Sequence, residues 1–158
     1  MTISSITNIL EKIAPLYLQE SYDNAGLIVG RKEMSCSGVL IALDATEEVV
    51  KEAISTQCNL IVAHHPIVFR GLKQFNEKNH VEKAIMLAIK NDIAIYACHT
   101  NLDNVINGVN GVIADRFGLT GQKILQPKTD LIKKLVVFCP IDASEKVQSA
   151  LLDRNSVV

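Results

Sequence analysis

The sequence predicts a layered α/β fold, in which a mixed, mainly parallel sheet is flanked by helices. Short apolar runs that suit buried strands alternate with segments whose apolar residues recur at helical spacing. The chain has 158 residues, of which 48% are hydrophobic, so it can form a domain with a substantial core.

A helix is expected to open the chain, over residues 4–18. Ile6, Ile9 and Ile13 recur there at helical spacing behind serine caps. Pro15 has no backbone N–H and a fixed φ, so we expect it to bend or end this helix.

Three strands and two helices are expected to follow. Residues 38–46, GVLIALDAT, form a continuous apolar run of the kind that is buried on both faces, and Thr46 is the expected N-cap of the next helix. Residues 59–65, NLIVAHH, predict a second strand, residues 77–92 a helix, and residues 93–103, IAIYACHTNLD, a third strand. Strands that alternate with helices are usually parallel.

The remaining chain predicts one more helix and then a separate unit. Residues 104–118 have a helical pattern, although Gly108 and Gly111 would weaken that helix unless another part of the chain packs closely there. Residues 131–140 predict a strand and residues 142–154 a helix. A single strand and helix cannot bury both of their faces, so this unit looks unfinished.

Charge and composition argue against several classes of protein. The 16 basic and 17 acidic residues are interspersed, which does not favour a nucleic-acid partner. There is no secretion signal and no apolar stretch near the roughly 20 residues that span a bilayer, so we expect a cytoplasmic protein without a membrane partner. The four cysteines form no CxxC pair, which argues against a zinc ribbon or a redox motif. A small-molecule substrate is the expected partner.

Polar side chains follow each of the three expected strands. Asp44 follows the first strand, His64 and His65 the second, and His99 and Asp103 lie at the end of the third. The carboxyl ends of parallel strands share one edge of a sheet, where ligands usually bind. Imidazole and carboxylate groups are common metal ligands, so the sequence predicts a metal site at this edge.

The adjacent histidines suggest two ions. Neighbouring residues of an extended segment point in opposite directions, so His64 and His65 can each serve a different ion. Pro66 restricts His65 to extended geometry. We therefore expect two divalent ions, which can be zinc, manganese, iron or nickel, and a metal-activated water of the kind used by hydrolases.

Four of the polar residues have two interpretations each. Asp44 either belongs to the site or anchors the turn into the following helix. His99 either binds a metal or orients Asp103 or a water molecule. Arg70 and Lys73, in the segment VFRGLKQF, either contact a phosphate-bearing substrate or belong to a solvated loop.

Three motifs resemble the Nif-three-like family, whose members are known as GTP cyclohydrolase I type 2-like or dinuclear metal-centre proteins. The motifs are ESYDNAGLIVG (20–30), LIVAHHPIVFRGLK (60–73) and YACHTNLDNVINGVN (96–110), in the family's order. The resemblance implies a two-domain α/β core with a two-metal site. It also implies a homo-oligomer, which is a hexameric ring in full-length members.

The same resemblance assigns roles to particular residues. His64, His65 and Asp103 fall on the family's metal ligands, and His99 falls on its site histidine. Tyr22 stands where the family usually has tryptophan. The family completes its site with an HxxxE pair near its C-terminus, but no histidine follows His99 in this sequence. We therefore expect the chain to be an N-terminal portion of a longer protein.

The resemblance also implies a division into domains. Residues 1–127 correspond to the first half of the metal-binding core. Residues 128–158 correspond to the beginning of an inserted ferredoxin-like α+β domain, which is truncated here.

The expected function is that of a dinuclear metal-dependent hydrolase, GTP cyclohydrolase I type 2-like. Such an enzyme acts on a nucleotide-like or phosphorylated small molecule through a metal-activated water. The alternatives are a non-catalytic metal-binding adaptor or scaffold protein, and a fragment whose metal site is incomplete.

Overall fold

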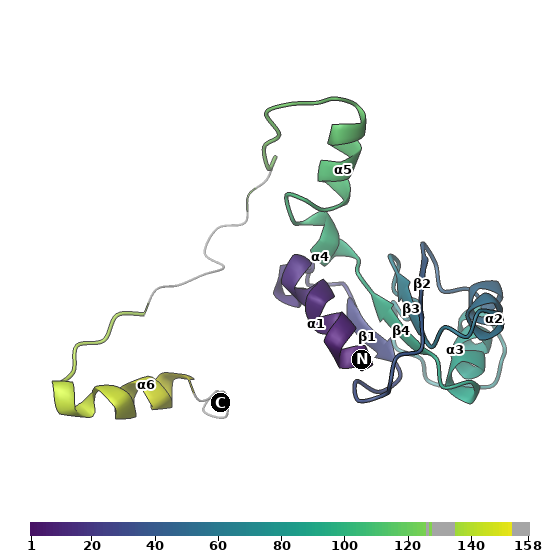
Figure 1. The fold of residues 1–158 in the computed structure, drawn as a ribbon, viewed down its shortest axis with the longest axis horizontal. Helices are drawn as coiled ribbons and strands as arrows, with labels where there is room; N and C mark the ends of the chain where they lie inside the picture. The colour runs from purple at the N-terminus through teal and green to yellow at the C-terminus, as the bar shows by residue number, and fades with distance from the viewer. Residues whose placement is uncertain (126, 128–134, 153–158) are drawn as a thin grey trace. The chain divides into compact units, whose positions relative to one another are not determined.

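The computed structural model describes residues 1–125, 127 and 135–152, and it divides into two compact units (Figure 1). The first unit is Met1–Lys123 and the second is Ile124–Val158. This division lies close to the expected boundary between residues 127 and 128. The assignment of the second unit to a ferredoxin-like domain remains a prediction.

A four-stranded sheet forms the centre of the first unit, with strand order β1-β4-β3-β2 (Figure 1). The strands are β1 (Gly26–Val29), β2 (Val39–Ala42), β3 (Leu60–Ala63) and β4 (Ala94–Ala97). β2, β3 and β4 are parallel, whereas β1 pairs antiparallel with β4. The α/β class and the mainly parallel sheet are thus confirmed. The sequence pattern does not predict β1, because its apolar run is short and bounded by glycines.

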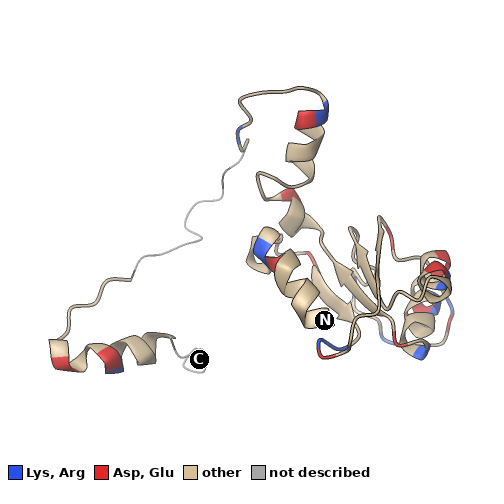
Figure 2. Ribbon diagram, viewed as in Figure 1, with Lys and Arg blue, Asp and Glu red and all other residues tan. Residues whose placement is uncertain are grey.

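The core lies on both faces of β3 and β4. Successive side chains of a strand point to opposite faces. Ile61 and Ile95 accordingly pack with α2 (Glu47–Ser55) and α3 (His80–Lys90), while Leu60 and Tyr96 pack against α1. All four of these side chains are fully buried. Acidic and basic residues are mixed along α2 and α3, as Figure 2 shows.

The first helix is shorter than predicted. α1 spans Ile3–Ile13 and ends before Pro15, so the predicted helix over residues 4–18 extends too far. The cap is Thr2 rather than a serine, because its Oγ1 accepts a hydrogen bond from the backbone N–H of Ser5 at 3.3 Å. After Pro15 the chain forms a short 3-10 turn, η1 (Leu16–Leu18).

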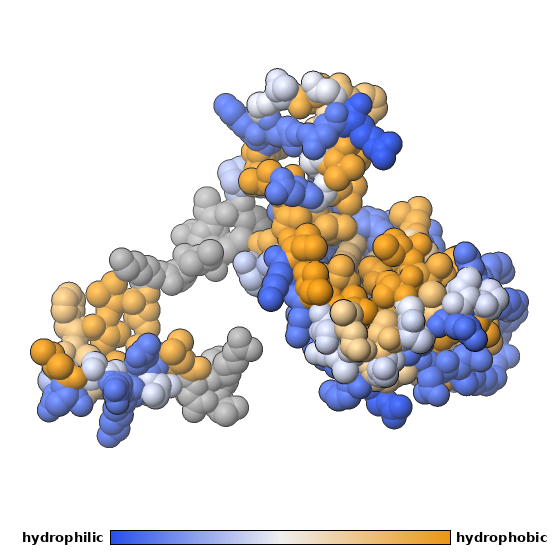
Figure 3. Space-filling model, in the orientation of Figure 1, coloured by the Kyte–Doolittle hydropathy of each residue, from blue (hydrophilic) through white to orange (hydrophobic). Residues whose placement is uncertain are grey.

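β2 is an edge strand, which corrects the prediction that it is buried on both faces. The side chain of Ile41 is 81% exposed and that of Val39 is 39% exposed. In the described part of the chain β2 has a strand neighbour on one side only. The cap after β2 is as predicted, since Thr46 Oγ1 accepts a hydrogen bond from the backbone N–H of Val49. Figure 3 shows that apolar side chains remain at the surface of this unit.

β4 ends well before the end of the predicted strand 93–103. The chain turns at His99 and continues as the short helix α4 (Thr100–Asp103). The buried side chain of Asn101 explains the turn. It accepts a hydrogen bond from the His99 backbone N–H at 2.9 Å and donates one to the Ala14 carbonyl at 2.7 Å. A buried amide needs such partners, and an extended strand would not supply them.

α5 (Val109–Arg116) occupies only part of the predicted helix over residues 104–118, and Gly108 is its N-cap. A Cβ atom on Gly108 would lie 1.8 Å from the carbonyl oxygen of Leu102. The expected close packing at the glycine is therefore present, and it ties α5 to the end of α4.

The second unit contains one helix in its described part. A 3-10 turn, η2 (Ile141–Ala143), leads into α6 (Ser144–Leu152), within the predicted helix 142–154. Of the predicted strand 131–140, residues 131–134 lie outside the described residues. Residues 135–140 form no regular element, so the strand prediction is wrong there. No helix in the described residues is both long and apolar enough to cross a bilayer.

A network of hydrogen bonds closes the loop before α3. The N-cap Asn79 accepts a hydrogen bond from the Glu82 backbone N–H at 2.9 Å. In return the Glu82 carboxylate accepts hydrogen bonds from the backbone N–H groups of Asn76 and Lys78 and from the Asn79 side chain. The bonds from Asn76 and Lys78 are the main reason why the pKa of Glu82 lies below its usual value.

We predict that Gly108→Ala destabilises the fold. The added methyl group would overlap the Leu102 carbonyl, and overpacking of this kind costs about 1–3 kcal/mol of unfolding free energy. Urea denaturation will measure this loss. The control is Gly71→Ala, whose Cβ would meet nothing within 4 Å, and its unfolding free energy should change by less than about 0.5 kcal/mol. Equal stability of the two variants would contradict the packing described.

We also predict that Glu82→Gln makes stability less sensitive to acid. The folded-state pKa of Glu82 lies below its usual value of 4.5, so the ionised carboxylate stabilises the fold above pH 4.5. This stabilisation is lost as the pH falls through the folded-state pKa. Thermal unfolding should show the variant less stable than the wild type at pH 7, with the difference shrinking below pH 4.5. Glu33→Gln, at an exposed site, is the control. A difference that stays constant with pH would refute this role.

Candidate metal centre

Three histidines meet at the carboxyl edge of the parallel strands. His64 and His65 follow β3, and His99 follows β4, its parallel neighbour. The ring centroids lie 5.0 Å apart for His64 and His65, 5.4 Å for His64 and His99, and 5.7 Å for His65 and His99. One ring nitrogen from each histidine lies within 4.8 Å of the others. The predicted convergence of these three side chains is therefore observed.

Each histidine is held by its Nδ1 atom. The partners are the Cys98 carbonyl for His64 at 2.9 Å, Asp44 for His65 at 2.8 Å, and Asp23 for His99 at 2.7 Å. Carbonyl and carboxylate oxygens accept hydrogen bonds, so each Nδ1 carries the proton. In the neutral ring, Nε2 then keeps its lone pair and is free to bind a metal. In its neutral form, each of the three rings would thus present Nε2 to a metal ion.

His64 and His65 do not point in opposite directions, which corrects the geometric argument made from their adjacency. The backbone N–H groups of both residues donate to the Leu43 carbonyl, at 3.1 and 3.0 Å, so the chain leaves extended geometry directly after β3. The two rings consequently lie side by side, with 53° between their planes.

Asp103 reaches the same group from α4. Its Oδ1 lies 3.9 Å from His64 Nε2, which is too far for a direct hydrogen bond. Both side chains are partly exposed. The carboxylate therefore faces a free ring nitrogen without being bonded to it, and the two can bind one cation together.

Asp44 belongs with the site in this structure. Its carboxylate accepts the His65 Nδ1–H bond, and both side chains are about half exposed. The structure thus shows Asp44 in contact with one histidine of the cluster, and its role in a metal site remains a prediction. Orientation by Asp44 is what a metal-binding histidine commonly requires.

Asp23 is a site residue that the sequence pattern does not reveal. Its side chain is fully buried and accepts hydrogen bonds from His99 Nδ1, from the backbone N–H and hydroxyl of Thr100, and from the backbone N–H of Asn24. Burial alone would raise the pKa of Asp23, but the hydrogen bonds from Thr100, His99 and Asn24 outweigh it and hold the pKa below its usual value. Asp23 lies before β1, at no strand end. Its place within the motif ESYDNAGLIVG was the only signal available.

Arg70 and Lys73 are both exposed. Neither makes a hydrogen bond or an ion pair with another residue in the described part of the chain. The neighbouring loop is anchored, because Asn24 Nδ2 donates to the Val68 carbonyl at 2.7 Å, and Phe69 contacts the His99 ring. A phosphate contact by the two basic residues remains a prediction.

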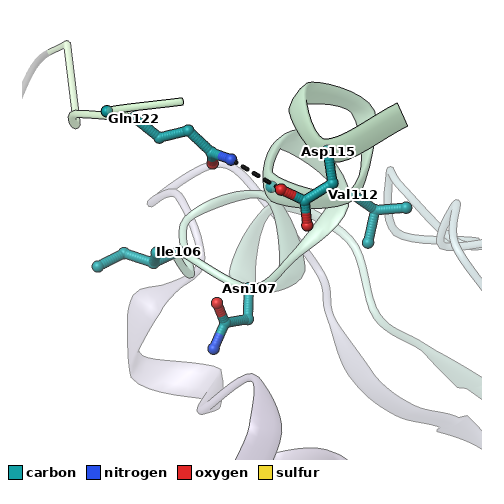
Figure 4. A pocket seen from close by; sticks show the side chains of 7 residues that line it. Ile106, Asn107, Val112, Asp115 and Gln122 are labelled. Carbon is teal, nitrogen blue, oxygen red and sulfur yellow. Dashed lines mark hydrogen bonds between the residues drawn. The ribbon is translucent and has the colours of Figure 1, made fainter. Parts of the chain in front are cut away.

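A separate hollow of about 400 Å³ lies beside α5 (Figure 4). Ile106, Asn107 and Val112 line it, together with Asp115 and Gln122, which are joined by a hydrogen bond of 3.1 Å. None of the histidines lines this hollow, so it is distinct from the candidate metal centre.

Comparison with known proteins shows close relatives. The chain is 37% identical over 134 residues to the "GTP cyclohydrolase 1 type 2 homolog" of Clostridium acetobutylicum, covering 85% of this chain and 50% of that protein. It is 40% identical over 148 residues to the protein of the same name in Halalkalibacterium halodurans, covering 93% of this chain and 40% of that protein. The chain therefore spans half or less of the length of these curated relatives.

A solved structure shows the same fold. The Bacillus cereus protein related to NIF3 superposes with a TM-score of 0.77 at 42% identity, over 81% of this chain and 35% of that chain. The family model Duf34/NIF3 (NGG1p interacting factor 3) matches residues 1–154. This chain belongs to the Duf34/NIF3 family.

Proposed function

We propose that this chain is part of a dinuclear metal-dependent hydrolase that acts on a nucleotide-like or phosphorylated small molecule through a metal-activated water. The observation that carries the proposal is the set of three imidazoles, each with Nδ1 bonded and Nε2 free, beside the Asp103 carboxylate. The name shared by the relatives, GTP cyclohydrolase 1 type 2 homolog, supports the same class of reaction.

The donor set fits divalent metal ions. Imidazole nitrogen and carboxylate oxygen are suitable ligands for zinc, manganese, iron and nickel. His64, His65 and Asp103 would hold the ions, with His99 as a further ligand or as a group facing them. Two ions with about three protein ligands each need more donors than these four. We propose that residues outside this chain, or a second copy in a ring-shaped homo-oligomer, complete the site.

The carboxylates that contact His65 and His99 orient these two rings. Asp44 and Asp23 accept hydrogen bonds from the Nδ1 atoms of His65 and His99, which fixes the orientation of each ring and leaves its Nε2 available to a metal. Divalent ions bound there would lower the pKa of a water molecule and polarise the group under attack. Because the rings are already oriented, little conformational freedom is lost when ligands bind.

The first test is the metal content. After incubation with zinc or manganese and dialysis, we expect the wild-type chain to retain up to about two ions per chain, and His64→Ala combined with His65→Ala to retain none. Mass spectrometry of the metals will measure this, and circular dichroism will confirm folding. His80→Ala, at the exposed start of α3, is the control. Metal that is retained equally by the wild type and by the folded double variant would refute the proposal. A wild-type chain that retains no metal would show that ligands from outside this chain are required.

A second test concerns Asp23. Removing its charge weakens the hold on His99, and loss of such a partner typically lowers metal affinity about 10- to 100-fold. We expect Asp23→Asn to show this decrease in a competition titration against a coloured zinc chelator. Asp92→Asn, which removes an exposed acid after α3, should leave the affinity unchanged. If folded Asp23→Asn binds zinc as tightly as the wild type, Asp23 does not support the site.

A second candidate function is a non-catalytic adaptor, because the family description refers to an interacting factor. The two functions differ in how they depend on metal. Release of product from GTP that needs metal, and that is lost in folded His64→Ala, favours the hydrolase. Partner binding that is unchanged by metal removal favours the adaptor.

A further inference from the structure

Two exposed aromatic side chains extend the histidine cluster outward. Tyr22 lies in the segment before β1, and Phe69 lies in the loop after β3. Their ring centroids are 6.3 Å apart, with 57° between the ring planes. Phe69 in turn meets His99, with centroids 6.3 Å apart and an edge-on angle of 86°. Aromatic surface therefore continues directly from the candidate metal centre.

This pair is not part of the core. Tyr22 is 64% exposed and Phe69 is 50% exposed, and neither belongs to the two buried clusters that pack the sheet. Exposed aromatic surface loses the stabilisation that its burial would supply. The described contacts thus account for the positions of the two rings but leave much of their surface uncovered.

The backbone beside each ring is nevertheless anchored. Tyr22 precedes Asp23, which is bonded to His99 and Thr100. Phe69 follows Val68, whose carbonyl accepts a hydrogen bond from the Asn24 side chain. The hydrogen bonds that orient His99 therefore also fix the segments that carry the two exposed rings.

We propose that Tyr22 and Phe69 form a stacking surface for a planar heteroaromatic ring of the substrate, held beside His99. This inference rests on the proposed function and narrows its substrate class to molecules that contain such a ring, among them nucleotides. Aromatic side chains stack on any nucleobase because every base has a π face. Arg70, next to Phe69 in the same exposed loop, is a suitable partner for a phosphate attached to that ring.

The test compares the binding of GTP, ATP and inorganic triphosphate to the zinc-loaded chain by calorimetry. Loss of one stacking ring should weaken binding of GTP and ATP about 5- to 150-fold in Tyr22→Ala and in Phe69→Ala. Binding of inorganic triphosphate should not change, because it has no ring to stack. Tyr22→Phe should bind as the wild type does, and Phe69→Leu, which keeps an apolar side chain without the π face, should show the loss.

Two further measurements separate stacking from other effects. In proton NMR, the nucleobase protons should shift upfield on binding to the wild type, and this shift should vanish in Phe69→Leu. Tyr17→Ala, which removes an exposed tyrosine in η1, is the matched control and should leave binding unchanged. The inference is overturned if the wild type binds neither nucleotide, or if Phe69→Leu and Tyr22→Ala bind both nucleotides as the wild type does.

Failure of this inference can be told apart from failure of the proposed function. Phe69→Leu should retain as much metal as the wild type, because Phe69 offers no ligand. Nucleotide binding that depends on the two rings, together with metal that is retained equally by the wild type and the His64→Ala, His65→Ala double variant, would reject the hydrolase and keep the stacking surface. Metal binding without ring-dependent nucleotide binding would keep the hydrolase and reject the stacking surface.

Discussion

The parallel register of β3 and β4 is the constraint on which the site depends. Leu60 pairs with Ala94 and Ala63 pairs with Ala97, so the two strands end level with each other. The Cys98 backbone N–H then donates to the Ala63 carbonyl at 2.9 Å, while the Cys98 carbonyl accepts the His64 Nδ1–H bond. A slip of one residue would turn every side chain of a strand to the opposite face. The buried layers on both faces of these strands prevent such a slip.

The strand alignment brings the histidines together, and the hydrogen bonds to their Nδ1 atoms then fix the orientation of the rings. Burial of the Asp23 carboxylate is costly in itself, but the donors from Thr100, Asn24 and His99 offset that cost and keep the group ionised. The same bonds link the segment before β1 to the end of β4. One buried acid therefore both holds the His99 ring and joins two parts of the chain that are distant in sequence.

Specific residues show how far the sequence could predict this architecture. The continuous apolar runs identify β3 and the start of β4, Thr46 is recognisable as a cap, and the histidines can be placed at strand ends because parallel strands share one edge. The turn at His99 could not be foreseen in this way. It depends on the buried Asn101 side chain reaching the Ala14 carbonyl, a contact between residues that are far apart in sequence.

Local pattern was therefore sufficient for the kind of fold and for the residue types of the candidate site, since strand burial, helix capping and strand-end placement depend on neighbouring residues. The exposure of β2, the side-by-side rings of His64 and His65, and the role of Asp23 follow from tertiary contacts. Each depends on which distant segment supplies a hydrogen bond or leaves a face of the sheet uncovered. The Leu43 carbonyl, for example, accepts hydrogen bonds from the backbone N–H groups of both His64 and His65. Partners of this kind leave no periodic trace in the sequence, because they are brought together only when the sheet forms.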